Sequence, residues 1–167
     1  MPSLNSTPQT ICILRLSAIG DTCHVVPVLR TLQQAWPAAR FTWVIGSLES
    51  KLMAALPEVE FIIVAKRAPR AQRRALAQQL RRRHFDVLLH MQLALRASLI
   101  ARRIRAPVKV GFDRARAREL QWLFTNQRIA ARSREHVLDS FFGFAAALGV
   151  TERLLRWDLP IREGARR

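Results

Sequence analysis

An aspartate closely follows an apolar run near the start of the chain, and its position suits acid–base chemistry. Residues 11–16 are mostly apolar without alternation, which predicts a buried strand that the segment 17–22 interrupts. In that turn Gly20 would let a ligand approach the backbone closely, and Asp21 would stand at the start of a helix with its carboxylate facing a crevice. Such a carboxylate can act as the general base that takes a proton from a hydroxyl, as in single-displacement sugar transfer. The alternative is that Asp21 simply caps the helix.

The same turn disfavours several other kinds of site. It lacks the G-x-G-x-x-G pattern of dinucleotide-binding proteins and the Lys-Ser/Thr ending of a P-loop, so NAD and ATP are disfavoured. The two cysteines, Cys12 and Cys23, match no zinc or redox spacing. We expect Cys23 and His24 to pack at the helix start, and His90 to pack at a strand end. No metal site and no cofactor are expected.

Strands and helices alternate along the chain. Apolar runs predict strands at 11–16, 41–45, 61–64, 87–91 and 108–112, and helical patterns lie at about 24–36, 48–56, 71–84, 95–104 and 136–148. This alternation predicts an α/β fold, a Rossmann-like parallel sheet with helices on both faces. Ligands of such sheets bind beyond the carboxyl ends of the strands, so the loops after the strands should hold the site.

Charge is concentrated in the middle of the chain. The 167 residues fit one domain and carry a net charge of +16, of which the segment 66–118 contributes +14. This segment predicts an anionic partner: nucleic acid, an anionic bilayer, or a phosphorylated small molecule or glycolipid. The alternative is that the arginines merely solvate exposed helix faces. No apolar run is long enough to span a membrane, and no signal peptide is evident, which favours a cytoplasmic protein.

Several segments resemble one enzyme family, the lipopolysaccharide heptosyltransferases of glycosyltransferase family 9. The run ILRLSAIGDTCHVVP at 13–27 is similar to the family's amino-terminal signature. Further similar segments follow in the family's order: WP at 36–37 with FTWVI at 41–45, LPEVE at 56–60, GFD at 111–113, ARE at 117–119 and HVLD at 136–139.

The resemblance implies the amino-terminal half of a GT-B glycosyltransferase. In that fold this half holds the lipid A and inner-core oligosaccharide acceptor, and a carboxyl-terminal domain binds ADP-heptose. The implied reaction is inverting and metal-independent, with Asp21 as the general base. The chain is about one domain long, so the resemblance implies that the donor-binding domain is absent and that the chain is inactive alone.

The resemblance also suggests residues that contact the acceptor. We expect Ser17, Gly20, Gln92, Arg96 and Arg118 there, with the two arginines gripping phosphate or carboxylate groups. A structural or interdomain role is expected for His136 and Glu119. Where relatives tend to have Asp-x-Gln-Gly after the fourth strand, this chain has HMQL at 90–93, which alters the loop around Gln92.

The expected organisation is a flexible lead over 1–10, an acceptor-binding domain over 11–158 and the start of an interdomain linker over 159–167. Expected partners are the lipid-linked acceptor, an anionic membrane surface on the cytoplasmic side of the inner membrane, and a separate carboxyl-terminal half. Nucleic acid is disfavoured, because Phe85 and Phe112 are the aromatic residues within the basic segment and stacking needs more. A non-catalytic remnant of the fold is a further alternative.

Overall fold

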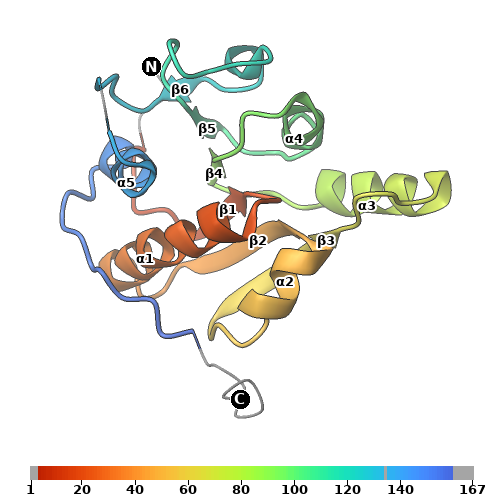
Figure 1. Ribbon diagram of the computed structural model, residues 1–167, viewed down its shortest axis with the longest axis horizontal. Helices are drawn as coiled ribbons and strands as arrows, with labels where there is room; N and C mark the ends of the chain where they lie inside the picture. Colours follow the sequence, from red (N-terminus) through yellow and green to blue (C-terminus); the bar gives the residue numbers. More distant parts are fainter. Residues whose placement is uncertain (1–3, 134, 160–167) are drawn as a thin grey trace.

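A parallel sheet with helices on both faces forms the centre of the molecule (Figure 1). The structure is a computed structural model and describes residues 4–133 and 135–159. Within them, six strands lie in the order β3-β2-β1-β4-β5-β6, and each pair is parallel. The strands are β1 (Thr10–Leu14), β2 (Arg40–Gly46), β3 (Val59–Val64), β4 (Val87–His90), β5 (Val108–Gly111) and β6 (Gln127–Arg128). The predicted α/β fold is confirmed.

The helices follow the strands as the alternation predicts. They are α1 (Ile19–Ala35), α2 (Ser47–Met53), α3 (Arg70–Arg82), α4 (Leu95–Ala101) and α5 (Val137–Ala147), with a short 3-10 helix, η1 (Gln121–Leu123). The start of α1 was predicted wrongly: it lies at Ile19 and not near His24, so Gly20 and Asp21 belong to the helix. A glycine in the first turn of a helix makes that turn look like a loop in the sequence, because glycine has a low helix propensity.

Two apolar clusters bury the two faces of the sheet. Ile11 and Ile13 of β1 face one cluster, which contains side chains of α1 and α5, whereas Cys12 and Leu14 face a second cluster with residues of α3 and α4. Alternate side chains of a strand point to opposite faces. Because both faces of β1 are covered, its sequence is continuously apolar.

The order in which strands are added to the sheet reverses between β1 and β4. From β1 the chain adds β2 and β3 on one side, then returns to place β4 on the other side, where Ile11 pairs with Val87. The carboxyl ends of β1 and β4 diverge into loops on the same edge, where parallel sheets bind ligands. Gly46, at the end of β2, also belongs to this edge: a Cβ there would overlap the carbonyl oxygen of Leu16 and the carboxylate of Glu49.

The third helix packs loosely on the rest of the domain. Along α3 the one buried side chain is Leu80, and its other residues are exposed or half-buried. Figure 1 shows α3 extending away from the sheet, beside α4. In the part of the chain that the structure describes, no helix is long and apolar enough to cross a membrane.

Candidate functional site

The turn after β1 and the loop after β4 meet at the point where the strand order reverses. Gln92 joins them: its Oε1 accepts hydrogen bonds from the amides of Leu16 (2.6 Å) and Ser17 (3.3 Å), and its Nε2 donates to Ser17 Oγ (3.2 Å). Gln92 and Ser17 therefore lie together, and the acceptor contact expected of both stays a prediction. Their polar atoms hold the turn in place, and the peptide bond between Ser17 and Ala18 is cis.

Asp21 is the third residue of α1, and its carboxylate does not cap the helix. The N-cap residue is Ala18, which makes no side-chain capping bond, so the capping alternative for Asp21 is wrong. Instead, Oδ2 of Asp21 accepts a hydrogen bond from Nη2 of Arg15 at 2.6 Å. The Asp21 side chain is 40% exposed, so its carboxylate is open to a ligand at the sheet edge.

Arg15 is a site residue that the sequence analysis missed. Its side chain is 11% exposed, its Nη1 donates to the carbonyl oxygen of Met91 at 2.6 Å, and its guanidinium carbon lies 5.4 Å from the centre of the Phe141 ring. Burial lowers the pKa of Arg15, and the charge of Asp21 acts in the opposite direction. An arginine stays protonated at neutral pH, so the pair is an ion pair. The sequence signal was a charged residue within an apolar strand run.

Gly20 leaves open space beside Asp21. It is the second residue of α1, it is exposed, and a Cβ added there would meet no atom within 4 Å. The sequence analysis expected close backbone approach at this position, and the surroundings of Gly20 leave room for it.

A buried glutamine that the sequence analysis did not single out fixes the end of β4. Gln121, in η1, donates from Nε2 to the carbonyl oxygens of His90 (2.9 Å) and Gln92 (3.1 Å), and its Oε1 accepts from the amide of Phe112 (3.0 Å). Three backbone groups of two adjacent strand ends are thereby satisfied by one side chain. Periodicity does not reveal such a residue, because two of its three partners, His90 and Gln92, are about 30 positions away in sequence.

Arg96 and Glu119 lie at the amino end of α4. Nη2 of Arg96 donates to the carbonyl oxygen of Ala65 at 2.8 Å, and Oε2 of Glu119 accepts from the amide of Leu95 at 2.6 Å. Arg118 is exposed, and no partner of its side chain is seen in the described ranges 4–133 and 135–159. None of these three side chains contacts Asp21 in the contacts found among those residues.

His136 and His90 have structural partners in the fold. His136 is the N-cap of α5, where its Nδ1 accepts from the amide of Leu138 at 3.2 Å, and its ring lies edge-on to that of His24 at 5.6 Å. His90 is fully buried, and its Nε2 lies 2.9 Å from Ser98 Oγ. Burial, together with the charge of Lys109, lowers the pKa of His90 to about 3, so the ring is neutral. Within the described part of the chain, no three metal-ligating side chains gather.

The model of glycosyltransferase family 9 (heptosyltransferase) matches residues 73–167. The chain belongs to glycosyltransferase family 9. A curated relative, the lipopolysaccharide core heptosyltransferase OpsX of Haemophilus influenzae, is 40% identical over 163 residues, which are 98% of this chain and 47% of OpsX. Lipopolysaccharide heptosyltransferase 1 of Escherichia coli K12 is 28% identical over 165 residues, covering 92% of this chain and 52% of the relative.

The fold agrees with membership of glycosyltransferase family 9. The structure of E. coli heptosyltransferase WaaC with ADP-2-deoxy-2-fluoro heptose matches 90% of this chain with a TM-score of 0.78 and 27% identity, and this match covers 52% of the WaaC chain. The chain thus spans about half the length of the relatives that it matches. The resemblance seen in the sequence is confirmed at the level of family and fold.

Proposed function

We propose that this chain is the acceptor-binding half of an inverting heptosyltransferase that uses ADP-heptose, with Asp21 as general base. The observation that carries the proposal is the placement of Asp21, a half-exposed carboxylate held by Arg15 at the sheet edge where β1 and β4 part. Family membership and the relatives' names support the substrates: curated relatives are called lipopolysaccharide heptosyltransferases, and WaaC was solved with an ADP-heptose analogue.

In the proposed reaction, an acceptor hydroxyl attacks the anomeric carbon of the heptose. Asp21 takes the hydroxyl proton as the new carbon–oxygen bond forms, and the bond from the anomeric carbon to the ADP phosphate oxygen breaks. ADP leaves with the bonding electron pair, and the anomeric configuration inverts. Arg15 holds Oδ2 of Asp21, so the other carboxylate oxygen is the one that faces the hydroxyl.

The acceptor is proposed to be the inner-core oligosaccharide on lipid A, which carries acidic groups. Arg118 is exposed, and Arg96 donates one hydrogen bond, from Nη2 to the carbonyl oxygen of Ala65. Both guanidinium groups therefore have donors left for phosphate or carboxylate oxygens. Gln92 and Ser17 are proposed to act mainly by holding the turn beside Asp21, because their side chains already bind each other and the backbone.

ADP-heptose is proposed to bind a second, carboxyl-terminal domain, whether or not that domain belongs to the same polypeptide. The protein would work at the cytoplasmic face of the inner membrane, where its lipid-linked acceptor is anchored. The 167 residues alone should bind acceptor and transfer no heptose, since displacement needs donor and acceptor held together.

Calorimetric titration tests whether this chain binds the acceptor while a second domain binds ADP-heptose. The purified chain should bind delipidated inner-core acceptor and fail to bind ADP-heptose. With the carboxyl-terminal half of a family 9 relative supplied in trans, transfer should appear and should fall by roughly 100-fold or more in Asp21→Asn, since general-base catalysis contributes about that much. Asp139→Asn, which alters an exposed carboxylate paired with Arg153, is the control and should keep its rate. Full transfer by Asp21→Asn would overturn the role of Asp21.

A further inference from the structure

A long groove runs between α3 and α4 on the face of the sheet opposite α1 and α5. Its main part has a volume of about 1230 Å³ and extends from the segment after β3 along α3 to Arg103. A second hollow of about 460 Å³ continues it past the end of α3, sharing Arg81, Leu99 and Arg103 with the first. We call the two together the α3–α4 groove. Loose packing of α3, whose one buried side chain is Leu80, leaves this space open.

The lining of the α3–α4 groove is basic throughout. Ten of its side chains are cationic, and none is acidic; the cationic ones are Lys66, Arg67, Arg70, Arg73, Arg74, Arg81, Arg96, Arg102, Arg103 and Arg105. Arg96, which is proposed above to contact the acceptor, lies at the amino end of α4, where the groove meets the acceptor edge. In the ion pairs found among the described residues, none of the ten takes part. Like charges at this density repel each other, so an anion with several charges would relieve the repulsion.

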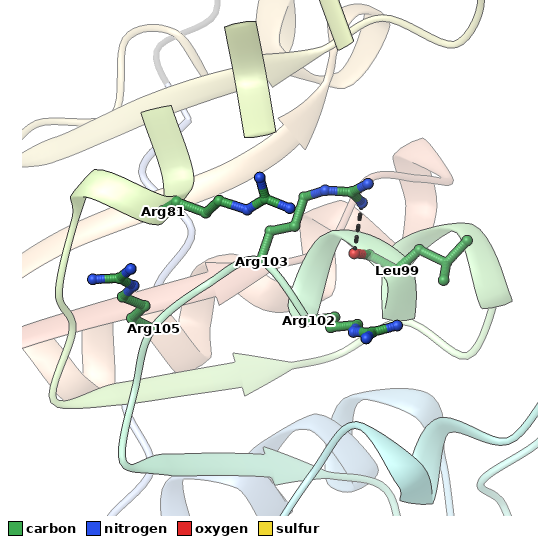
Figure 2. Close-up of a pocket in the computed structure, with 5 residues that line it drawn as sticks. All are labelled: Arg81, Leu99, Arg102, Arg103 and Arg105. Atoms are coloured by element: carbon green, nitrogen blue, oxygen red, sulfur yellow. Dashed lines mark hydrogen bonds between the residues drawn. The ribbon is translucent and has the colours of Figure 1, made fainter. Parts of the chain in front are cut away.

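The far end of the groove shows the arrangement most plainly. Figure 2 shows Arg81 at the end of α3 beside Arg103, with Arg102 and Arg105 on the segment that follows α4. The Arg103 Nη1 donates to the carbonyl oxygen of Leu99 at 3.1 Å, and no other hydrogen bond from these four guanidinium groups is found among the described residues, which leaves donors for phosphate oxygens. Guanidinium groups match phosphate in a planar, bidentate manner.

Apolar side chains beside these arginines narrow the choice of partner. Ile63 and Leu99 line the groove and are 54% and 43% exposed, whereas the lining contains no aromatic residue. The two aromatic residues of the basic segment, Phe85 and Phe112, are buried and cannot stack on bases. A second copy of this chain would bring a groove of the same charge. Aliphatic groups among arginines suit the interface of an anionic bilayer.

We propose that the α3–α4 groove is the surface on which this domain rests on an anionic phospholipid bilayer. This inference rests on the proposed function, because a lipid-linked acceptor requires the domain to work at a membrane. Since α1 and α5 cover the opposite face, the sheet would lie with one face toward the lipid. Asp21 and the acceptor edge would then open along the membrane surface and not into it.

Vesicle co-sedimentation of the complete 167-residue chain tests the proposal. Binding should be strong to vesicles of mixed phosphatidylcholine and phosphatidylglycerol, weak to phosphatidylcholine alone, and reduced by salt. Arg81→Glu with Arg105→Glu should weaken binding by roughly 25-fold or more, because each basic residue near the surface contributes about a factor of five. The matched control is Arg40→Glu with Arg128→Glu, which has the same net charge and alters exposed arginines of β2 and β6.

The two double variants distinguish binding through the α3–α4 groove from general electrostatic attraction between a cationic protein and anionic vesicles. A loss confined to the groove pair supports the proposal, whereas equal losses in both pairs overturn it. Vesicle binding unchanged in the groove pair, with loss of binding to single-stranded RNA, also overturns it in favour of a nucleic-acid surface. If the groove pair lowers the folded fraction by circular dichroism, Arg81→Gln with Arg105→Gln replaces it, and we expect vesicle binding to weaken by roughly 25-fold.

A separate titration distinguishes this proposal from the proposed function. The groove pair should bind delipidated acceptor as the unaltered chain does, because neither Arg81 nor Arg105 belongs to the acceptor edge. Loss of vesicle binding with acceptor binding intact supports the groove as a membrane surface. Retention of vesicle binding with acceptor binding intact overturns the groove proposal and leaves the acceptor role standing.

Discussion

The carboxylate of Asp21 is held at one oxygen and free at the other. Arg15 binds Oδ2, and among residues 4–133 and 135–159 no partner of Oδ1 is found. The Arg15 side chain is itself held by the carbonyl oxygen of Met91 and by the ring of Phe141. The orientation of the Asp21 carboxylate is therefore fixed through Arg15. Under the proposed mechanism, Arg15 is a positioning residue that acts on the reaction through Asp21.

Replacing Arg15 should affect turnover more than acceptor binding. In Arg15→Met, the aliphatic stem still packs near Phe141, but Asp21 loses its fixed orientation, so we expect kcat to fall roughly 10- to 100-fold with little change in KM for the acceptor. The measurement uses the chain with a donor half in trans. Arg15→Lys retains a cation and should recover part of the rate. If both variants turned over as fast as the unaltered chain, the ion pair would not position the base.

His90 makes the stability of the domain depend on pH. Its pKa is about 3 in the folded protein, because of burial and then the charge of Lys109, whereas an unfolded histidine titrates near 6.5. Below about pH 6.5 the unfolded chain binds a proton that the folded chain does not. The contribution of His90 to the free energy of unfolding is therefore complete above that pH and is lost as the pH falls. Because Ser98 is the polar neighbour of Nε2 and no carboxylate pairs with the ring among the described residues, nothing there stabilises the charged form.

The free energy of unfolding should fall by about 1 kcal/mol from this residue between about pH 7 and about pH 5.5. Urea titrations at several pH values measure it. His90→Gln should remove most of this slope, whereas His84→Gln, at an exposed position, should keep it. A slope unchanged by His90→Gln would show that the histidine binds a proton equally in the folded and unfolded states.

At the level of elements, the predictable parts were those with a strong local pattern. The five apolar runs became β1 to β5, because parallel strands covered on both faces need continuous apolar sequence. By contrast, β6 has two residues and η1 three, which are too short for any periodicity to show. The start of α1 was missed because Ile19 and Gly20 read as part of a loop.

The candidate site was predictable in part. Asp21, Ser17 and Gln92 were singled out because their segments resemble a family signature or follow a strand, and the structure places all three at one edge of the sheet. Arg15 and Gln121 were not, because what makes them important is contact with residues that are distant in sequence, such as Met91 and His90. A single sequence shows which residues are polar, but the pairing of loops decides which of them meet.

Glu119 supports α4 from outside the helix. Its carboxylate accepts from the amide of Leu95, which no residue of the helix can satisfy, and its backbone has a φ of 51°. Glu119→Ala should destabilise the domain by about 1 kcal/mol, the usual cost of losing a cap. Glu119→Gln keeps an acceptor oxygen and should lose less. Urea unfolding, with hydrogen exchange at the Leu95 amide, would show the difference; equal stability of Glu119→Ala and the unaltered chain would contradict it.

For the whole molecule, charge and packing are divided between the faces of the sheet. α1 and α5 contact each other and bury the larger apolar cluster, whereas α3 and α4 leave a groove lined by cations. Of the sixteen basic side chains in the segment 66–118, ten line this groove. Under the groove proposal, this division of charge would let the domain meet an anionic bilayer in one orientation.

Gly20 and Gly46, the two glycines near the site, should differ in how well they tolerate substitution. Gly46 has no room for a Cβ beside Leu16 and Glu49, whereas Gly20 has open space around it. Sorting a library of random substitutions for folded protein alone should therefore keep glycine at position 46 and admit many residues at position 20. If a second sorting for acceptor capture then restored glycine at position 20, the need for glycine there would come from the ligand and not from the fold.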